Sequence, residues 1–349
     1  MVNLIYDERF LKHYSELYSH PESPSRLTMA LNALKSYGAL DKVAVVNRVE
    51  ELNYELPYEV HDKDYVELIR TLSAKGFNYV DSDTYVNSHT FEVAILALSA
   101  SILAHKLCIS TGRPSYVIAR PPGHHAGIRG RALGAPTLGF CIFNNIAVLA
   151  KRLLKEGFKN IVIIDIDAHH GNGTQEIFIS EPKVIHIDIH QQGIYPGTGE
   201  LYEVGIGDGE GSKINIPLPA GSGDDIYKEV FNEVIEPLIN EVEPEYILIS
   251  AGYDAHYSDP LTDLRATAMT YYYYFRKLNE LAGTLCSGRL VAILEGGYGE
   301  GLSKGILNSI AALNNEEPYI TESETLSSYR PQAVIGRVKE VIKRYWKLS

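Results

Sequence analysis

Five short runs of mostly apolar, often β-branched residues recur along the chain, at 116–119, 161–166, 184–189, 246–250 and 290–294. Such runs are typical of strands that are buried on both faces of a sheet. Longer segments with helical periodicity lie near 91–108, 143–156, 224–240, 264–283 and 301–313. Because strands that alternate with helices form parallel sheets, the pattern predicts an open, mostly parallel, doubly wound α/β sheet with helices on both faces.

No repeat, linker or change of composition divides the chain, so we expect a single domain over residues 1–349. A helix should begin near Ser25, after the rigid loop 21–24, and an amphipathic helix should lie near 334–347. The apolar stretch 91–109 includes charged side chains, so we expect a buried helix rather than a membrane span.

Charge and cysteine content narrow the expected partners and location. The formal net charge is −12, which disfavours direct nucleic acid binding and favours basic protein tails or cationic small molecules. Three irregularly spaced cysteines fit reduced thiols better than a disulfide framework. With no basic and apolar leader at the N-terminus, we expect a cytoplasmic protein without a membrane partner.

Four of the five predicted strands are followed at once by clusters of glycine, histidine, aspartate or tyrosine. In open parallel sheets, ligands bind beyond the carboxyl ends of the strands. We therefore expect the four clusters to converge on one site. They are RPPGHHAG at 120–127, DIDAHHGNG at 165–173, AGYDAH at 251–256 and EGGYGEG at 295–301.

The second and third clusters contain candidate metal ligands. Asp165 and Asp167 share one face of a strand, and His169 follows at its end. Together with Asp254, Asp167 and His169 make an Asp-His-Asp set, which suits one zinc ion with a position left open for water. The side chain of His170 should point away from His169, so we expect a structural role for it.

The first and fourth clusters contain candidate proton-transfer and oxyanion groups. His124 and His125, held after a double proline, could serve as general base and general acid, with Asp165 and Asn172 free to orient their rings. Tyr298 lies between glycines, and its phenol could stabilise an oxyanion. The alternative is that Tyr298 is only a loop anchor.

Seven strings in this order resemble the histone deacetylase and acetylpolyamine amidohydrolase superfamily. The sequence is similar to its class II branch, because Asn172 stands where the class I branch has an aspartate. The strings are HPESPSR at 20–26, RPPGHHAG at 120–127, GFCIFNN at 139–145, DIDAHHGNGTQ at 165–175, YPGTGE at 195–200, AGYDAHYSDP at 251–260 and EGGYG at 295–299.

The resemblance implies a role for each matching residue. His125 would be the general base and acid and His124 its electrostatic partner, with Asp165 behind the first histidine and Asn172 behind the second. Tyr298 would be the oxyanion donor. The residues that match the family's zinc ligands are Asp167, His169 and Asp254. Those that match the acyl tunnel are Gly139, Phe140 and Tyr195, with Asp83 at its rim. Those that match a structural potassium site are Asp165, Asp167, His169 and Asp188.

One segment departs from the simple picture of an acidic tunnel mouth. Residues 128–138 follow the histidine pair and include Arg129 and Arg131, so the entrance should carry positive charge as well. The expected function is zinc-dependent hydrolysis of an acetyl or acyl amide. The amine product could be a protein lysine, a polyamine or another small amine.

Two other functions are compatible with parts of this sequence. A binuclear manganese ureohydrolase of the arginase type shares the expected fold, but Gly171 stands where those enzymes have a bridging aspartate, and His256 replaces a second aspartate. A non-catalytic protein that binds acetyl-amines would not require the complete set of ligands, histidine pair and tyrosine.

Overall fold

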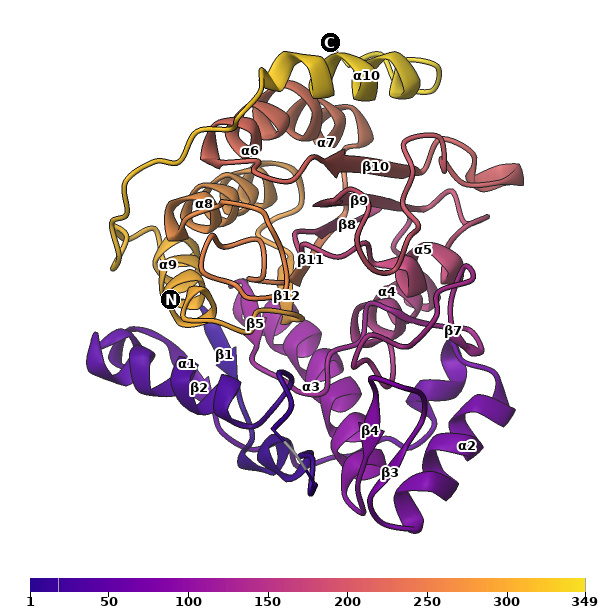
Figure 1. Cartoon of the computed structure of the whole chain (residues 1–349). Coiled ribbons are helices and arrows are strands. Elements are labelled where there is room, and N and C mark those ends of the chain that lie inside the picture. The colour runs from indigo at the N-terminus through magenta and orange to yellow at the C-terminus, as the bar shows by residue number, and fades with distance from the viewer. Residues whose placement is uncertain (18, 349) are drawn as a thin grey trace.

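The computed structural model describes residues 1–17 and 19–348. Its centre is an eight-stranded, wholly parallel sheet in the order β10-β9-β8-β11-β12-β5-β1-β2 (Figure 1). The strands are β1 Asn3–Ile5, β2 Ala44–Val46, β5 Ser115–Val117, β8 Ile161–Asp165, β9 Val184–Gln191, β10 Lys213–Leu218, β11 Tyr246–Ala251 and β12 Leu290–Leu294.

The sheet confirms the predicted fold class. The five predicted strands are β5, β8, β9, β11 and β12. The pattern did not predict the three-residue strands β1 and β2, which lie at one end of the sheet. It also missed β10 and two small antiparallel ribbons, formed by β3 Asn78–Tyr79 with β4 Tyr85–Val86 and by β6 Ala126–Gly127 with β7 Gly130–Arg131.

Helices cover both faces of the sheet. Figure 1 shows α3 and α4 on one face and α8 and α9 on the other. All predicted helices are present. The helices are α1 Ser25–Ser36, α2 Lys63–Ala74, α3 Thr90–Thr111, α4 Asn145–Lys155, α5 Asn172–Ile177, α6 Asp224–Val230, α7 Glu236–Val242, α8 Ala268–Leu285, α9 Gly301–Leu313 and α10 Pro331–Ile342.

The helix expected over 224–240 is interrupted by a π-helical turn, Phe231–Ile235, between α6 and α7. The turn precedes Pro237, whose nitrogen has no hydrogen to donate to the carbonyl one turn earlier. A single π turn accommodates that missing bond without ending the helix.

Helix α3 is long and apolar enough to cross a membrane, but 67% of its most apolar window is buried within the fold. It packs against α4 and against strands β1, β5 and β12. These contacts are typical of a core helix in an α/β domain. They agree with the prediction of a buried helix, which was based on the charged side chains in this stretch.

The register of the sheet brings the candidate residues together. Asp165, the last residue of β8, is paired with Ser250 of β11 on one side and with Asp188 of β9 on the other. Since the strands are parallel, the segments that follow β5, β8, β11 and β12 all leave from the same edge. Each of the four sequence clusters is therefore in reach of the others.

Candidate active site

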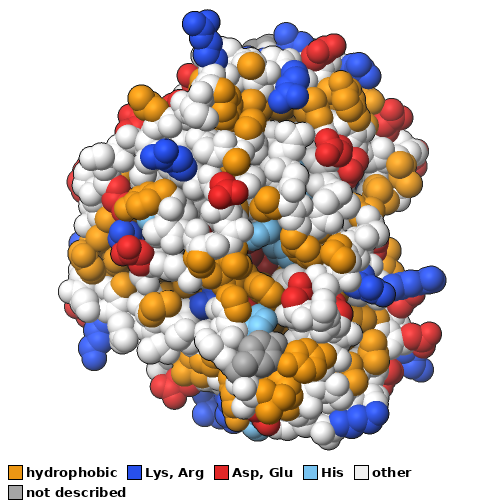
Figure 2. Space-filling model, in the orientation of Figure 1, with side chains coloured by type: hydrophobic (Ala, Val, Ile, Leu, Met, Phe, Trp, Pro, Cys, Tyr) orange, Lys and Arg blue, Asp and Glu red, His pale blue; other side chains and the backbone are white. Residues whose placement is uncertain are grey.

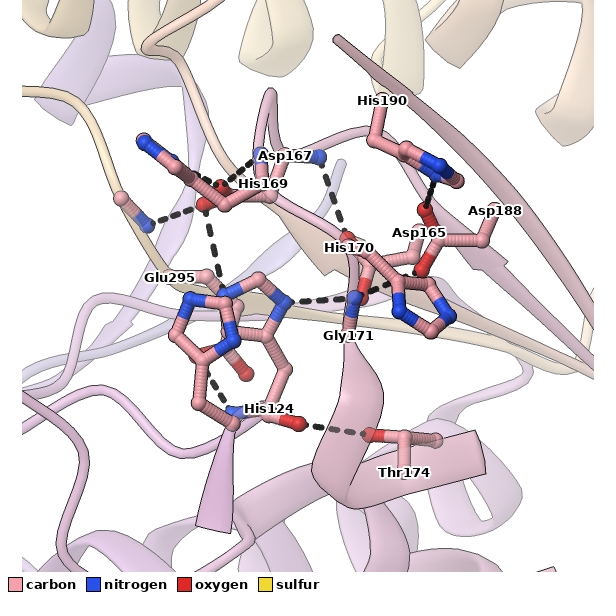
Figure 3. Close-up of polar contacts among 12 residues, drawn as sticks. His124, Asp165, Asp167, His169, His170, Gly171, Thr174, Asp188, His190 and Glu295 are labelled. Carbon is pink, nitrogen blue, oxygen red and sulfur yellow. Dashed lines mark hydrogen bonds and ion pairs between the residues drawn. The ribbon is translucent and has the colours of Figure 1, made fainter. Parts of the chain in front are cut away.

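The expected metal ligands converge at the carboxyl ends of β8 and β11. Ligand atoms of Asp167, His169 and Asp254 all lie within 4.8 Å of one another. The Nδ1 atom of His169 is 2.9 Å from Oδ2 of Asp254 and 3.2 Å from Oδ1 of Asp167. Figure 3 shows the imidazole of His169 against the Asp167 carboxylate. Figure 2 shows a hollow near the centre of this face, with histidine at its floor.

This group has the donor chemistry and the space for one metal ion. Burial and the neighbouring Asp167 raise the pKa of Asp254 to about 7, and a cation held beside these two carboxylates would stabilise their charged forms. Gly296 leaves the necessary room, because a Cβ atom at that position would lie 2.5 Å from both carboxylates. Two oxygens and one imidazole nitrogen are typical zinc donors, so the residues fit zinc.

The histidine pair lies beside this group, and each ring has its own partner. Nδ1 of His124 is hydrogen-bonded to Oδ2 of Asp165 at 2.9 Å, and Nδ1 of His125 to Oδ1 of Asn172 at 2.8 Å. The Asn172 amide donates its N–H to the carbonyl oxygen of Ala132, which identifies its oxygen as the acceptor from His125. His125 therefore carries its proton on Nδ1, and its Nε2 lone pair is available.

The surroundings shift the pKa values of the two histidines in opposite directions. Burial lowers the pKa of His124, but Asp165 and Asp167 outweigh it and hold that pKa well above its usual value. For His125, burial and repulsion from His124 push the pKa well below its usual value. At neutral pH the first ring is a cation and the second a neutral base, so the pair can stabilise negative charge and accept a proton.

Tyr298 lies in the loop that follows β12. Its ring packs edge-on against Phe140, with centroids 5.6 Å apart, and the guanidinium of Arg26 lies 4.8 Å from its centroid. Asp259 accepts the backbone N–H of Tyr298 at 2.7 Å. Burial raises the pKa of the phenol well above its usual value, so the side chain keeps its O–H as a donor.

Aromatic side chains flank the histidine pair and the tyrosine. Tyr195 packs edge-on against His125, with centroids 4.9 Å apart, and its hydroxyl donates to the carbonyl oxygen of Thr137. Gly139 lies between them, with a φ of +53°, and a Cβ there would come within 2.7 Å of both rings. Only glycine fits this position, which lets the chain pass behind the ring of Tyr195 and continue to Phe140.

Asp83 supports the wall of this region. Its Oδ2 accepts the hydroxyl of Thr137 at 2.5 Å, and its Oδ1 accepts the hydroxyl of Thr84, which in turn accepts the N–H of Phe140. The carboxylate thus ties the β3–β4 ribbon to the segment that carries Phe140. The expected rim arginine Arg129 is paired with Asp62 on the surface.

The four residues matched to a potassium site are divided between two groups. The side chains of Asp167 and His169 belong to the candidate metal group with Asp254, whereas Asp165 and Asp188 form a second buried group with His186. Asp188 accepts the N–H of Gly171 and is hydrogen-bonded to His190 (Figure 3). The sequence interpretation missed His186, because its position beneath Asp165 depends on the pairing of β9 with β8.

His170 turns away from the metal group, as expected, and is hydrogen-bonded to Thr198 and Gln175.

The sequence did not predict the role of Arg26. Arg26 donates to the carbonyl oxygens of Glu295 and Gly297 and so holds the loop that carries Tyr298. Arg26 belongs to the string HPESPSR, and Glu295 and Gly297 belong to EGGYG, but nothing in the spacing of the two strings indicated that they are in contact.

Comparison with known proteins identifies the family of this chain. The model of the histone deacetylase domain matches residues 20–313. The chain belongs to the histone deacetylase family. A probable deacetylase from Archaeoglobus fulgidus is 39% identical over 366 residues, which cover 99% of this chain and 99% of that protein. The chloroplastic histone deacetylase 14 of Arabidopsis thaliana is 36% identical and covers 93% of this chain and 80% of its own length.

A solved structure of the family matches the fold along nearly its whole length. The crystal structure of the HDA15 HD domain has a TM-score of 0.88 and 32% sequence identity, with 99% of this chain and 95% of that chain covered. Membership in this family agrees with the resemblance drawn from the seven strings. It supports hydrolase chemistry, and the metal group described above fits the zinc dependence that is general in the family.

Proposed function

We propose that this histone deacetylase family member hydrolyses the acyl amide of acetylated lysine side chains or of acetylated small amines, with one zinc ion per chain. The observation that carries the proposal is the position of His124 and His125, each oriented by its own hydrogen-bond partner, beside the group of Asp167, His169 and Asp254. A protein that only binds acetyl-amines has no need of a base next to a metal site.

Zinc, when held by Asp167, His169 and Asp254, supplies the Lewis acidity that activates water and the acyl carbonyl toward each other. Nε2 of His125 accepts the proton of the attacking water, and the same atom then donates it to the leaving amine. The imidazolium of His124 lies beside these charges and stabilises them. The phenol O–H of Tyr298 donates to the oxyanion of the tetrahedral intermediate.

Several contacts favour one metal over the two of a ureohydrolase. A Cβ atom at Gly171 would lie 2.4 Å from Oδ2 of Asp165, so the bridging aspartate of that class has no room here. His256, which replaces the second aspartate, is hydrogen-bonded to Ser258 and Glu322 instead. Potassium at the group of Asp165 and Asp188 and a cytoplasmic location remain predictions.

The metal content is the first test of this proposal. The purified protein should contain about one tightly held zinc ion per chain and should lose activity when a strong chelator removes it. Inductively coupled plasma mass spectrometry of the native and chelated protein measures this directly. Two manganese ions per chain, with urea released from a guanidino substrate, would favour the ureohydrolase alternative.

The substrate class requires a panel of acetylated and longer-acylated lysine peptides and polyamines, compared by kcat/KM. We expect cationic acetyl-amines to react better than neutral ones at low salt, because the chain has a net charge of −12 and a carboxylate, Asp83, near the tunnel wall. Salt screens such steering, so the ratio of the two kcat/KM values should shrink as ionic strength rises. A ratio that stays flat across ionic strength would exclude steering as its cause.

A further inference from the structure

Glu295 connects the histidine pair to the strand beside it. This residue follows β12 and its side chain is fully buried. Its Oε2 atom accepts two consecutive backbone N–H groups, that of Gly123 at 2.7 Å and that of His124 at 3.2 Å. In Figure 3 the carboxylate lies directly against the segment from which the His124 ring projects. The loop that carries both histidines is therefore attached to the end of β12 through one carboxylate oxygen.

The next residue attaches the same strand end to the metal ligands. The N–H of Gly296 donates to Oδ2 of Asp167 at 2.8 Å. Arg26 holds this segment in place, since its guanidinium donates to the carbonyl oxygen of Glu295 at 2.5 Å and to that of Gly297 at 2.7 Å. Two adjacent residues thus contact the histidine loop on one side and a metal ligand on the other.

Stability alone does not explain a glutamate at this position. Among the described residues, the second carboxylate oxygen of Glu295, Oε1, is buried without a hydrogen-bond partner. A buried carboxylate with an unused oxygen carries a desolvation cost that an apolar side chain would avoid. What this side chain contributes is its other oxygen, which accepts two N–H groups of the histidine loop.

We propose that Glu295 is a positioning residue that fixes the His124–His125 pair relative to the metal ligands. This inference rests on the proposed function for its meaning in catalysis. Its consequence is that the Nε2 atom of His125 keeps its distance from the attacking water. A displacement of about 1 Å in such a geometry costs on the order of 10²-fold in rate.

Three substitutions of Glu295 distinguish the effect of a correctly placed acceptor oxygen from the effect of the negative charge. Glu295→Gln keeps an acceptor oxygen with two lone pairs at the same reach, so we expect kcat to stay within about threefold of the wild type. Glu295→Ala removes the acceptor, and Glu295→Asp withdraws it by one methylene. For both we expect kcat to fall by about 10²-fold, with KM and zinc content little changed.

Asp224 provides a matched control. It is as fully buried as Glu295 and also accepts two backbone N–H groups, those of Thr267 and Thr325, but neither partner belongs to the proposed metal ligands or to the histidine loop. Asp224→Ala should lower Tm at least as much as Glu295→Ala, yet leave kcat of the folded protein within about threefold of the wild type. Equal losses of kcat in both variants would show that Glu295 acts only through stability.

A spectroscopic measurement tests the position without relying on turnover. In the full-length protein labelled with ¹⁵N-histidine, the ring signals of His124 can be assigned by their loss in His124→Gln. We expect Glu295→Ala to shift these signals, and Glu295→Gln and Asp224→Ala to leave them in place. If Glu295→Ala shifts the His124 signals but the wild-type protein releases no acetate, the positioning role is supported and the proposed function is contradicted.

The inference would be overturned by unshifted His124 signals and near-normal kcat in Glu295→Ala. It would also be overturned if Glu295→Gln lost as much kcat as Glu295→Ala, since charge rather than hydrogen bonding would then be responsible. Loss of zinc in parallel with kcat would place the role of Glu295 in metal binding instead. If Glu295→Ala does not fold, Glu295→Asp supplies the same comparison with a carboxylate retained.

Discussion

Tyr298→Phe is expected to lower turnover by about 10² to 10³, the usual effect of removing one oxyanion donor, on the order of 3 kcal/mol. The substitution removes only the hydroxyl, so the ring keeps its contacts with Phe140 and Arg26. Because the hydroxyl donates to charge that develops after water attacks, its loss should lower kcat far more than it raises KM. Steady-state kinetics on an acetyl-lysine peptide measures both.

Tyr274→Phe is a suitable control for this experiment. The Tyr274 hydroxyl is buried in α8 and donates to the carbonyl oxygen of Tyr227, away from the site. Its removal should lower Tm and leave kcat unchanged. If Tyr298 were only a loop anchor, Tyr298→Phe would behave in the same way as this control, with near-normal turnover, and the oxyanion role would have to be abandoned.

His125→Ala is expected to lower turnover by at least about 10²-fold, the scale of a lost general acid–base group. The physical reason is that Nε2 of His125 carries a free lone pair in a ring whose pKa is depressed by burial and by His124. Zinc content should not change, because the ring is not among the three proposed ligands. Turnover and metal analysis on the same preparation test both parts.

A histidine remote from the site is the matched control. His105 is buried in α3 and is hydrogen-bonded to Tyr246 and Glu156. His105→Gln should lower stability and leave turnover and zinc content near those of the wild type. Zinc loss that follows the activity loss in His125→Ala would show that His125 is itself a ligand, and the role assigned to it would be wrong.

The parts of the site that sequence could predict lie at strand ends. Asp167 and His169 follow β8 directly, and Asp254 follows β11, so a run of apolar residues was enough to place them at one edge of the sheet. The same rule placed the histidine pair and Tyr298. Strand β1 was missed because the polar Asn3 leaves only two consecutive apolar residues within it, whereas the equally short β5 lies in an apolar run that extends to Ala119.

What sequence could not predict depends on contacts between distant segments. Glu295 meets the histidine loop across 171 positions in the chain, and Arg26 meets the loop after β12 across 271. His186 joins Asp165 only through the register of β8 and β9. The partners of Asp83 likewise follow from the packing of the β3–β4 ribbon against the segment before Phe140, which no local pattern encodes.

The central claim is hydrolysis of an acyl amide at a single zinc site, and acetate release tests it most directly. The chelated protein, and the same protein reloaded with zinc, should each be incubated with an acetyl-lysine peptide, and acetate and free lysine side chains quantified. We predict equal amounts of both products, formed only by the zinc-loaded protein. Release of no carboxylic acid from any acyl-lysine or acetylpolyamine substrate, despite full zinc occupancy, would contradict the account.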